Sequence, residues 1–166
     1  SGSNFTDGNL EVQARKKMIE ERVTSLILKN PDYIRLIKED HLELFSDRIG
    51  QFLKEVIKIV ENQKPADEKE LSKNLKSVLG SSIPELQLDE ELKNFLAALS
   101  LSVDSEDIDE EDGIQEVELC LLHLKNIQLK DKLSNISEDI KKAEISKDQQ
   151  KVDSLIGEFN KLTKEL

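Results

Sequence analysis

Two histidines and one cysteine are the side chains of this sequence that most often take part in chemistry. His41 lies in the run Glu39-Asp40-His41-Leu42-Glu43, where carboxylates beside an imidazole could ligate a metal ion. A protein metal site usually needs three or four convergent ligands, and no second histidine lies near His41. We therefore interpret His41 as a surface or helix-end histidine rather than a metal ligand.

His123 and Cys120 lie in one apolar stretch of the chain. A histidine on a helical bundle would suit a phosphotransfer module. That family places lysine three residues after its histidine and then glycine, whereas this sequence has Asn126 and Ile127. We interpret His123 as a histidine at the edge of a bundle and Cys120 as a small buried hydrophobe.

The acidic stretch 104–112 is the remaining candidate, because carboxylates bind hard cations. A cation-binding loop needs ligands at defined spacing with a glycine in the bend, and Gly113 comes too late for that pattern. We expect a mobile, solvated loop that leads into a helix N-terminus. Glycine-rich phosphate loops and serine nucleophile elbows are also absent from the sequence. The sequence therefore predicts no catalytic residue, no metal site and no cofactor.

The composition narrows the classes of partner. The sequence is 37% apolar but only 4% aromatic, so its core must be built from Leu, Ile and Val. A net charge of −11 argues against binding to nucleic acid or to an anionic membrane, and it leaves a basic protein partner possible. A single cysteine excludes an internal disulfide. With no signal peptide visible at the start and no apolar run of roughly 20 residues, we expect a cytoplasmic protein.

Apolar residues recur with the helical period throughout the sequence, which predicts an all-α fold. Asn30 and Pro31 should cap and open a short second helix, Ser46 should cap a third, and Gly80 should end a fourth that Asp67 and Glu70 open. Residues 1–9 are expected to be a tag remnant and disordered lead. The helices of the first part are expected at about 10–29, 31–37, 47–62, 67–79 and 89–100.

The last third of the sequence predicts a long helix from Ile114 to about Ile145. Leu119, Leu122 and Asn126 begin a coiled-coil seam, and a second stripe should bury the front of this helix on two faces. Ser146 and Gln149 have the spacing of a capping box at a turn. We therefore predict a compact bundle over 10–125 and an antiparallel helical hairpin over 126–166. The hairpin seam is expected to comprise Leu129, Leu133, Ile136, Ile140, Val152, Leu155, Phe159 and Leu162.

Two parts of the sequence carry a family resemblance. The first is Glu21-Arg22-Val23-Thr24-Ser25-Leu26-Ile27-Leu28-Lys29-Asn30-Pro31-Asp32, and the second comprises the runs 129–133, 143–148 and 152–162. Together they resemble the C-terminal domain of bacterial DnaG-type DNA primases. The first part is similar to a Glu-Arg, Leu-rich, Pro-Glu signature that opens that domain. The second resembles the family's last two helices, although Lys147 replaces the small residue usual before the aspartate of the turn.

The resemblance implies a helical bundle with a terminal hairpin that docks on the N-terminal domain of the hexameric replicative helicase. Docking brings the primase to the replication fork and modulates the helicase. Zinc and magnesium would belong to catalytic domains that this sequence does not contain. The chain is expected to be a monomer in isolation. The residues expected to contact the partner are Lys141, Ile145, Gln149, Asp153, Ile156, Asn160, Thr163 and Leu166.

Two other binding functions fit the same pattern. A similar signature opens the N-terminal domain of the replicative helicase itself, which shares the shape of a bundle with a hairpin. An unrelated coiled-coil adaptor would also carry heptad seams, but it would self-associate strongly through them. An enzyme or phosphorelay protein is disfavoured by the missing constellations of reactive side chains.

Overall fold

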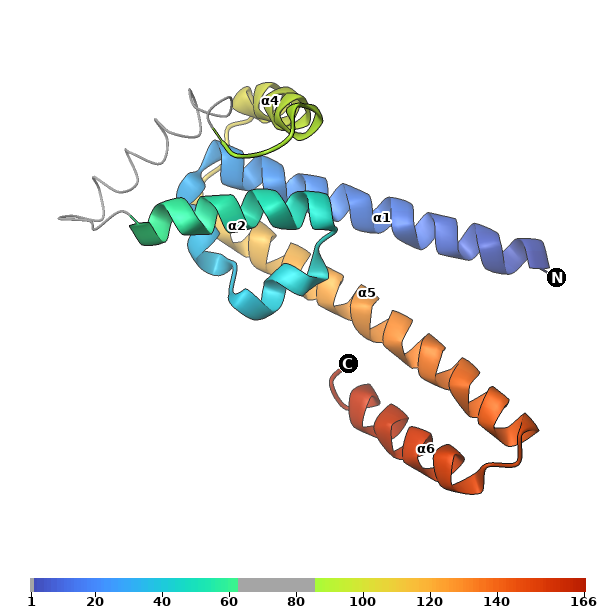
Figure 1. Ribbon diagram of the computed structural model, residues 1–166. Coiled ribbons are helices and arrows are strands. Elements are labelled where there is room, and N and C mark those ends of the chain that lie inside the picture. Colours follow the sequence, from blue (N-terminus) through green and yellow to red (C-terminus); the bar gives the residue numbers. More distant parts are fainter. Residues whose placement is uncertain (1, 63–85) are drawn as a thin grey trace. The chain divides into compact units, whose positions relative to one another are not determined.

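The computed structural model describes residues 2–62 and 86–166, with side chains from residue 8 onward, and every regular element in these ranges is helical (Figure 1). The prediction of an all-α fold is confirmed for this part of the chain. The expected helix over 67–79, with its caps, lies outside the described residues. The elements are α1 (Gly2–Lys29), η1 (Pro31–Leu36), η2 (Glu39–Leu44), α2 (Asp47–Asn62), α4 (Glu90–Asp104), α5 (Glu110–Ile145) and α6 (Gln149–Thr163).

The chain divides into two compact units, Ser1–Leu121 and Leu122–Leu166. The division falls within α5, so this helix contributes its first turns to one unit and its remainder to the other. The sequence had placed this boundary at 125/126. Because the division lies inside a helix, no change of composition marks it in the sequence.

The core of the first unit is mostly aliphatic, as the shortage of aromatic residues predicts, and its buried aromatic side chains are Tyr33, Phe45 and Phe52. α1 packs against α4 and η1, and α2 packs against η1 and η2. Burying one such side chain contributes about 1.5–3 kcal/mol, so these residues dominate the stability of the unit. The apolar residues of this unit with no exposed surface are Val23, Leu26, Ile27, Phe52, Leu53, Val56, Leu92, Leu96 and Val117.

Two helix starts agree with the sequence and carry a capping side chain. Asn30 accepts a hydrogen bond from the Asp32 amide with Pro31 at the first helical position, and Asp89 accepts one from the Leu92 amide. Element η1 is a 3₁₀ helix rather than an α-helix, as is common in short connecting pieces. Helix α2 begins and ends where the periodicity predicted.

Three helices are longer than expected. α1 begins at Gly2, where a disordered lead was expected, and no proline interrupts it before Lys29. α4 continues to Asp104, and α5 begins at Glu110 inside the acidic stretch. The acids in the first turn of α5 favour that start, because the helix dipole is positive there.

The front of α5 is buried on one face, not on the two faces expected. Val117, Leu121 and Leu124 are buried, but Leu119 and Leu122 are 54% and 53% exposed. The predicted seam is therefore uncovered at its first two positions.

Candidate partner-binding surface

All eight predicted seam residues of the second unit are shielded from solvent. Leu129, Ile136 and Val152 are buried, and the other five are half-buried. From residue 130 to the end of the chain, every residue that is not exposed belongs to the predicted seam, apart from buried Ala143, which continues the same stripe. These eight positions are therefore the ones at which this unit shields its apolar side chains from solvent.

We call the eight predicted partner-contacting residues the partner stripe, and all of them are exposed. Ile145 ends α5 with 82% of its surface exposed, and Ile156 on α6 is 42% exposed. At 100° per residue, the positions on α6 share one face, about a quarter-turn from the α6 seam. The apolar members of this stripe are thus directed to solvent next to a seam that is covered.

The polar members of the partner stripe already make contacts along α6. Gln149 donates through Nε2 to the Asp153 carboxylate at 2.9 Å, and the Thr163 hydroxyl donates to the Asn160 carbonyl at 2.8 Å. A partner would have to compete with or accommodate these bonds. Ile145, Ile156 and Leu166 have only water to displace, which makes them the stronger candidates for binding energy.

A tight turn at Ser146–Asp148 reverses the chain after Ile145 (Figure 1). The Asp148 amide donates to the Ala143 carbonyl and the Lys147 amide donates to the Glu144 carbonyl, which is the Schellman pattern. Lys147 has φ 57°, and it is the only non-glycine residue with positive φ in the described ranges. Lys147, which replaces the small residue usual in the primase-like pattern, therefore adopts a left-handed backbone conformation that is unfavourable for a residue with a long side chain.

The predicted capping box of Ser146 and Gln149 is wrong. Asp148 caps α6, because its carboxylate accepts the hydrogen bond of the Lys151 amide. The Ser146 hydroxyl instead donates to the Ala143 carbonyl at the end of α5. Both Ser146 and Asp148 are capping residue types, and the turn geometry decided which of them the helix uses.

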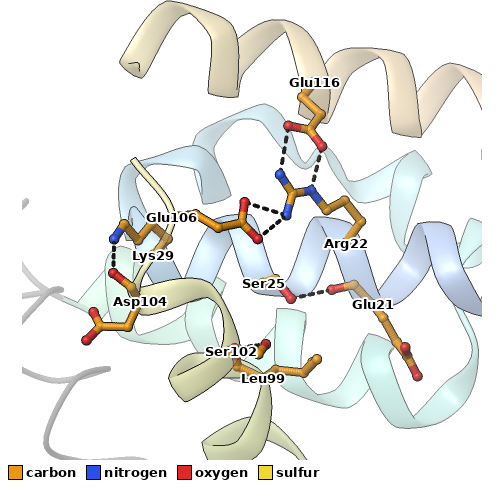
Figure 2. Close-up of polar contacts among 9 residues, drawn as sticks. All are labelled: Glu21, Arg22, Ser25, Lys29, Leu99, Ser102, Asp104, Glu106 and Glu116. Carbon is orange, nitrogen blue, oxygen red and sulfur yellow. Dashed lines mark hydrogen bonds and ion pairs between the residues drawn. The ribbon is translucent and has the colours of Figure 1, made fainter. Parts of the chain in front are cut away.

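Arg22 on α1 forms salt bridges with Glu106 and Glu116, which are distant from it in the sequence (Figure 2). Its Nε and Nη2 donate to both carboxylate oxygens of Glu116 on α5, and its Nη1 lies 3.0 Å from each carboxylate oxygen of Glu106. The hydrogen bonds that Arg22 donates to Glu116 are the main cause that raises the pKa of Arg22, with Glu106 adding to the rise and burial opposing it. The paired bonds to Glu116 fix the direction of the guanidinium plane.

The expected solvated loop that leads into a helix N-terminus is present: residues 106–109 form no regular element, all of them but Ile108 are exposed, and α5 begins at Glu110. Besides Glu106, the Asp104 carbonyl accepts a hydrogen bond from Lys29 Nζ at 2.7 Å (Figure 2), and the Glu110 carbonyl accepts one from the Tyr33 hydroxyl at 3.2 Å. Three side chains from α1 and η1 therefore hold this stretch against the first unit. The acidic residues are evident in the sequence, but their contacts with Arg22 and Lys29 on α1 are not.

The residues first considered for chemistry occupy structural positions. The ring nitrogen Nδ1 of His41 accepts a hydrogen bond from the Lys38 amide and so closes the start of η2. His123 and Cys120 are half-buried on α5. Burial raises the pKa of the Cys120 thiol, and the Glu116 charge adds to that rise. Within the described ranges, no group of three or more His, Cys, Asp or Glu side chains could hold a metal ion.

Sequence reasoning missed the Arg22 cluster and the site of Gly113. Arg22 belongs to the family-like signature, but a salt bridge between residues 84 or 94 positions apart leaves no periodic signal. Gly113 comes too late in the sequence for a cation-binding loop, and nothing near it in the sequence indicates its contact with Tyr33. A Cβ built there would lie 2.6 Å from Tyr33 Cζ, so the buried ring requires glycine at this point of α5.

Comparisons with protein-family models, with curated proteins and with solved structures found no match. Among the residues that the structure describes, no helix has the length and apolar character to cross a lipid bilayer.

Proposed function

We propose that this chain is the helicase-interaction domain of a bacterial DNA primase. It would dock on the N-terminal domain of the hexameric replicative helicase, recruit primer synthesis to the replication fork in the cytoplasm and modulate helicase activity. Its own role is binding rather than catalysis, and zinc and magnesium would act in other domains of the parent protein. The resemblance of its first and last helices to the primase family supports this proposal.

The proposed architecture is a compact bundle joined through α5 to an antiparallel hairpin of the end of α5 and α6. Support comes from the second unit, in which the seam side chains of both helices are shielded and a Schellman turn reverses the chain between them. A closed seam leaves the outer faces of the two helices as the surface on which a partner helix can pack.

The observation that carries the proposal is the exposure of Ile145 and Ile156 beside this covered seam. A branched apolar side chain that is 82% exposed contributes nothing to the stability of its own helix end. Buried by a partner, such a side chain typically contributes about 1–3 kcal/mol. The stripe therefore offers binding energy at positions that folding does not use.

The test is association with a hexameric replicative helicase, measured by light scattering with the chain and with two variants. We expect Ile145→Ser and Ile156→Ser each to weaken association about tenfold, the equivalent of about 1.4 kcal/mol. Leu101→Ser is the matched control, because Leu101 lies on α4 and is 78% exposed. Truncation after Lys125 should abolish association.

Other outcomes would point elsewhere. Association that survives truncation after Lys125 would move the main contact into the first unit. No association with a correctly assembled helicase would remove the primase assignment. A chain that binds a primase C-terminal domain instead would be the N-terminal domain of the helicase, and one that self-associates strongly would be a coiled-coil adaptor.

A further inference from the structure

A groove in the first unit lies away from the partner stripe and is not explained by it. It has a volume of about 330 Å³ and lies between α1, the start of α2 and α4. Its lining includes Lys16, Lys17, Glu20, Arg48, Ile49 and Phe95. All these elements belong to one compact unit, so the groove is a feature of that unit alone.

The floor of the groove is apolar. Ile49 is buried with 4% of its surface exposed, and Phe95 is half-buried on α4. The Arg48 guanidinium lies 4.3 Å from the centre of the Phe95 ring, so the cation is held against the aromatic face. An occupant of this groove would contact a hydrocarbon floor with a fixed positive charge at its edge.

The rim of the groove is cationic in a chain whose net charge is −11. Lys16 and Lys17 have no ion pair with any residue in the described ranges. Glu20 is 5% exposed, and its carboxylate accepts the Ser46 amide at the start of α2, so it serves that helix end rather than the groove. The cations on the lining outnumber the carboxylates even when Glu20 and Glu21 are both counted.

We propose that this groove is a docking site for an acidic amphipathic segment of a partner protein. One apolar side chain of the segment would rest on Ile49 and Phe95, and a neighbouring carboxylate would pair with Lys16, Lys17 or Arg48. On a helix such a pair is three or four residues apart. A nucleic acid is a poorer occupant, because its phosphates need an extended basic face that a chain of this charge lacks.

The overall charge of the chain makes the test selective. Nonspecific attraction to a net charge of −11 favours basic peptides and opposes acidic ones. Binding of an acidic peptide would therefore have to come from a local site. The probes are a short labelled amphipathic peptide of Glu, Leu and Phe, the same peptide with Gln for every Glu, and the same peptide with Lys for every Glu.

Affinity would be measured by fluorescence anisotropy with the full chain, and the site would be mapped by NMR chemical-shift changes. We expect the acidic peptide to bind and to shift Ile49 and Phe95, with at least tenfold weaker binding by the Gln peptide. The double variant Lys16→Gln/Lys17→Gln should weaken binding of the acidic peptide about tenfold. Arg15→Gln is the matched control, because Arg15 is exposed on α1 and does not line the groove.

Four results would overturn the proposal. These are no binding by the acidic peptide, shifts confined to residues outside the groove, equal binding by the Gln peptide, and shifts of the same groove residues by the Lys peptide. None of these results depends on association with the helicase, so the groove and the proposed function succeed or fail separately.

Discussion

One missing methyl group allows η1 and α5 to approach each other. Gly113 is buried in the second turn of α5, and Tyr33 fills the space that a Cβ would occupy. The Tyr33 hydroxyl then reaches the Glu110 carbonyl, so the ring and the glycine together fix where α5 begins. The cost of glycine within a helix, about 1 kcal/mol relative to alanine, is offset here by packing.

Gly113→Ala is expected to destabilise the chain by about 1–3 kcal/mol, because the Tyr33 ring would have to leave a buried position. Gly157→Ala is the matched control: Gly157 lies in α6 with no atom within 4 Å of an added Cβ. It should stabilise the chain by about 1 kcal/mol through helix propensity. Urea unfolding measures both effects. If both variants were stabilised to the same extent, Tyr33 would not constrain residue 113.

Arg22 acts through geometry as well as charge, so Arg22→Lys should not be a neutral change. Lysine carries its donors on a single nitrogen, so it cannot reproduce the planar fork in which three nitrogens of Arg22 reach Glu116 and Glu106. The three side chains are each about one-third exposed or more, so the expected loss is only about 1 kcal/mol in the free energy of unfolding. Arg15→Lys on the exposed part of α1 is the control and should change nothing. Equal stability of the two variants by thermal unfolding would contradict this account.

At the scale of elements, the turn between α5 and α6 combines a standard motif with a poorly suited residue. The Schellman hydrogen bonds require a left-handed backbone at the position of Lys147, where glycine has no steric cost. Asp148 compensates at the start of α6 by capping it. The turn thus fixes the place of Ile145, the most exposed apolar side chain of the partner stripe.

Lys147→Gly is therefore expected to stabilise the second unit by about 1 kcal/mol, because it removes the left-handed penalty of a side chain. Lys132→Gly, on the exposed face of α5, should destabilise it by a similar amount of about 1 kcal/mol. Hydrogen exchange of the α6 amides would measure both changes. A loss of protection in the Lys147 variant would show that the lysine side chain itself holds the turn.

At the scale of the whole molecule, the balance of charge and apolar surface predicts a monomer. The seam side chains of the second unit are shielded within the chain, so they cannot also form a strong dimer. A net charge of −11 adds repulsion between copies. Leu119 and Leu122 are exposed, but two side chains provide far less than the roughly 800 Å² per partner of a stable interface.

Sedimentation equilibrium should therefore give the mass of one chain, 18.9 kDa, over a wide range of protein concentration. Raising the salt concentration should not produce dimers, because screening the repulsion adds no apolar contact. A dimer that Leu122→Gln converts to a monomer would show that the uncovered front of the seam pairs between copies.

The sequence by itself determined the helical class, the limits of α2 and the solvent-shielded positions of the second unit. Each of these depends on local periodicity or on a capping residue, and both are properties of neighbouring residues. Asp89 and Asn30 were readable as helix starts for the same reason. The exposure of Ile145 and Ile156 follows from the same periodicity, because they lie off the seam.

Only the tertiary structure decided which side chains from distant segments meet. Arg22 meets the carboxylates of Glu106 and Glu116 only because of how α1 packs near α4 and α5. The anchoring of the acidic stretch and the contact of Tyr33 with Gly113 depend in the same way on the packing of α1 and η1. The cationic groove likewise gathers lysines of α1, Arg48 of α2 and Phe95 of α4. Long-range pairs have no periodicity in the sequence, and their formation depends on packing that a single helix does not encode.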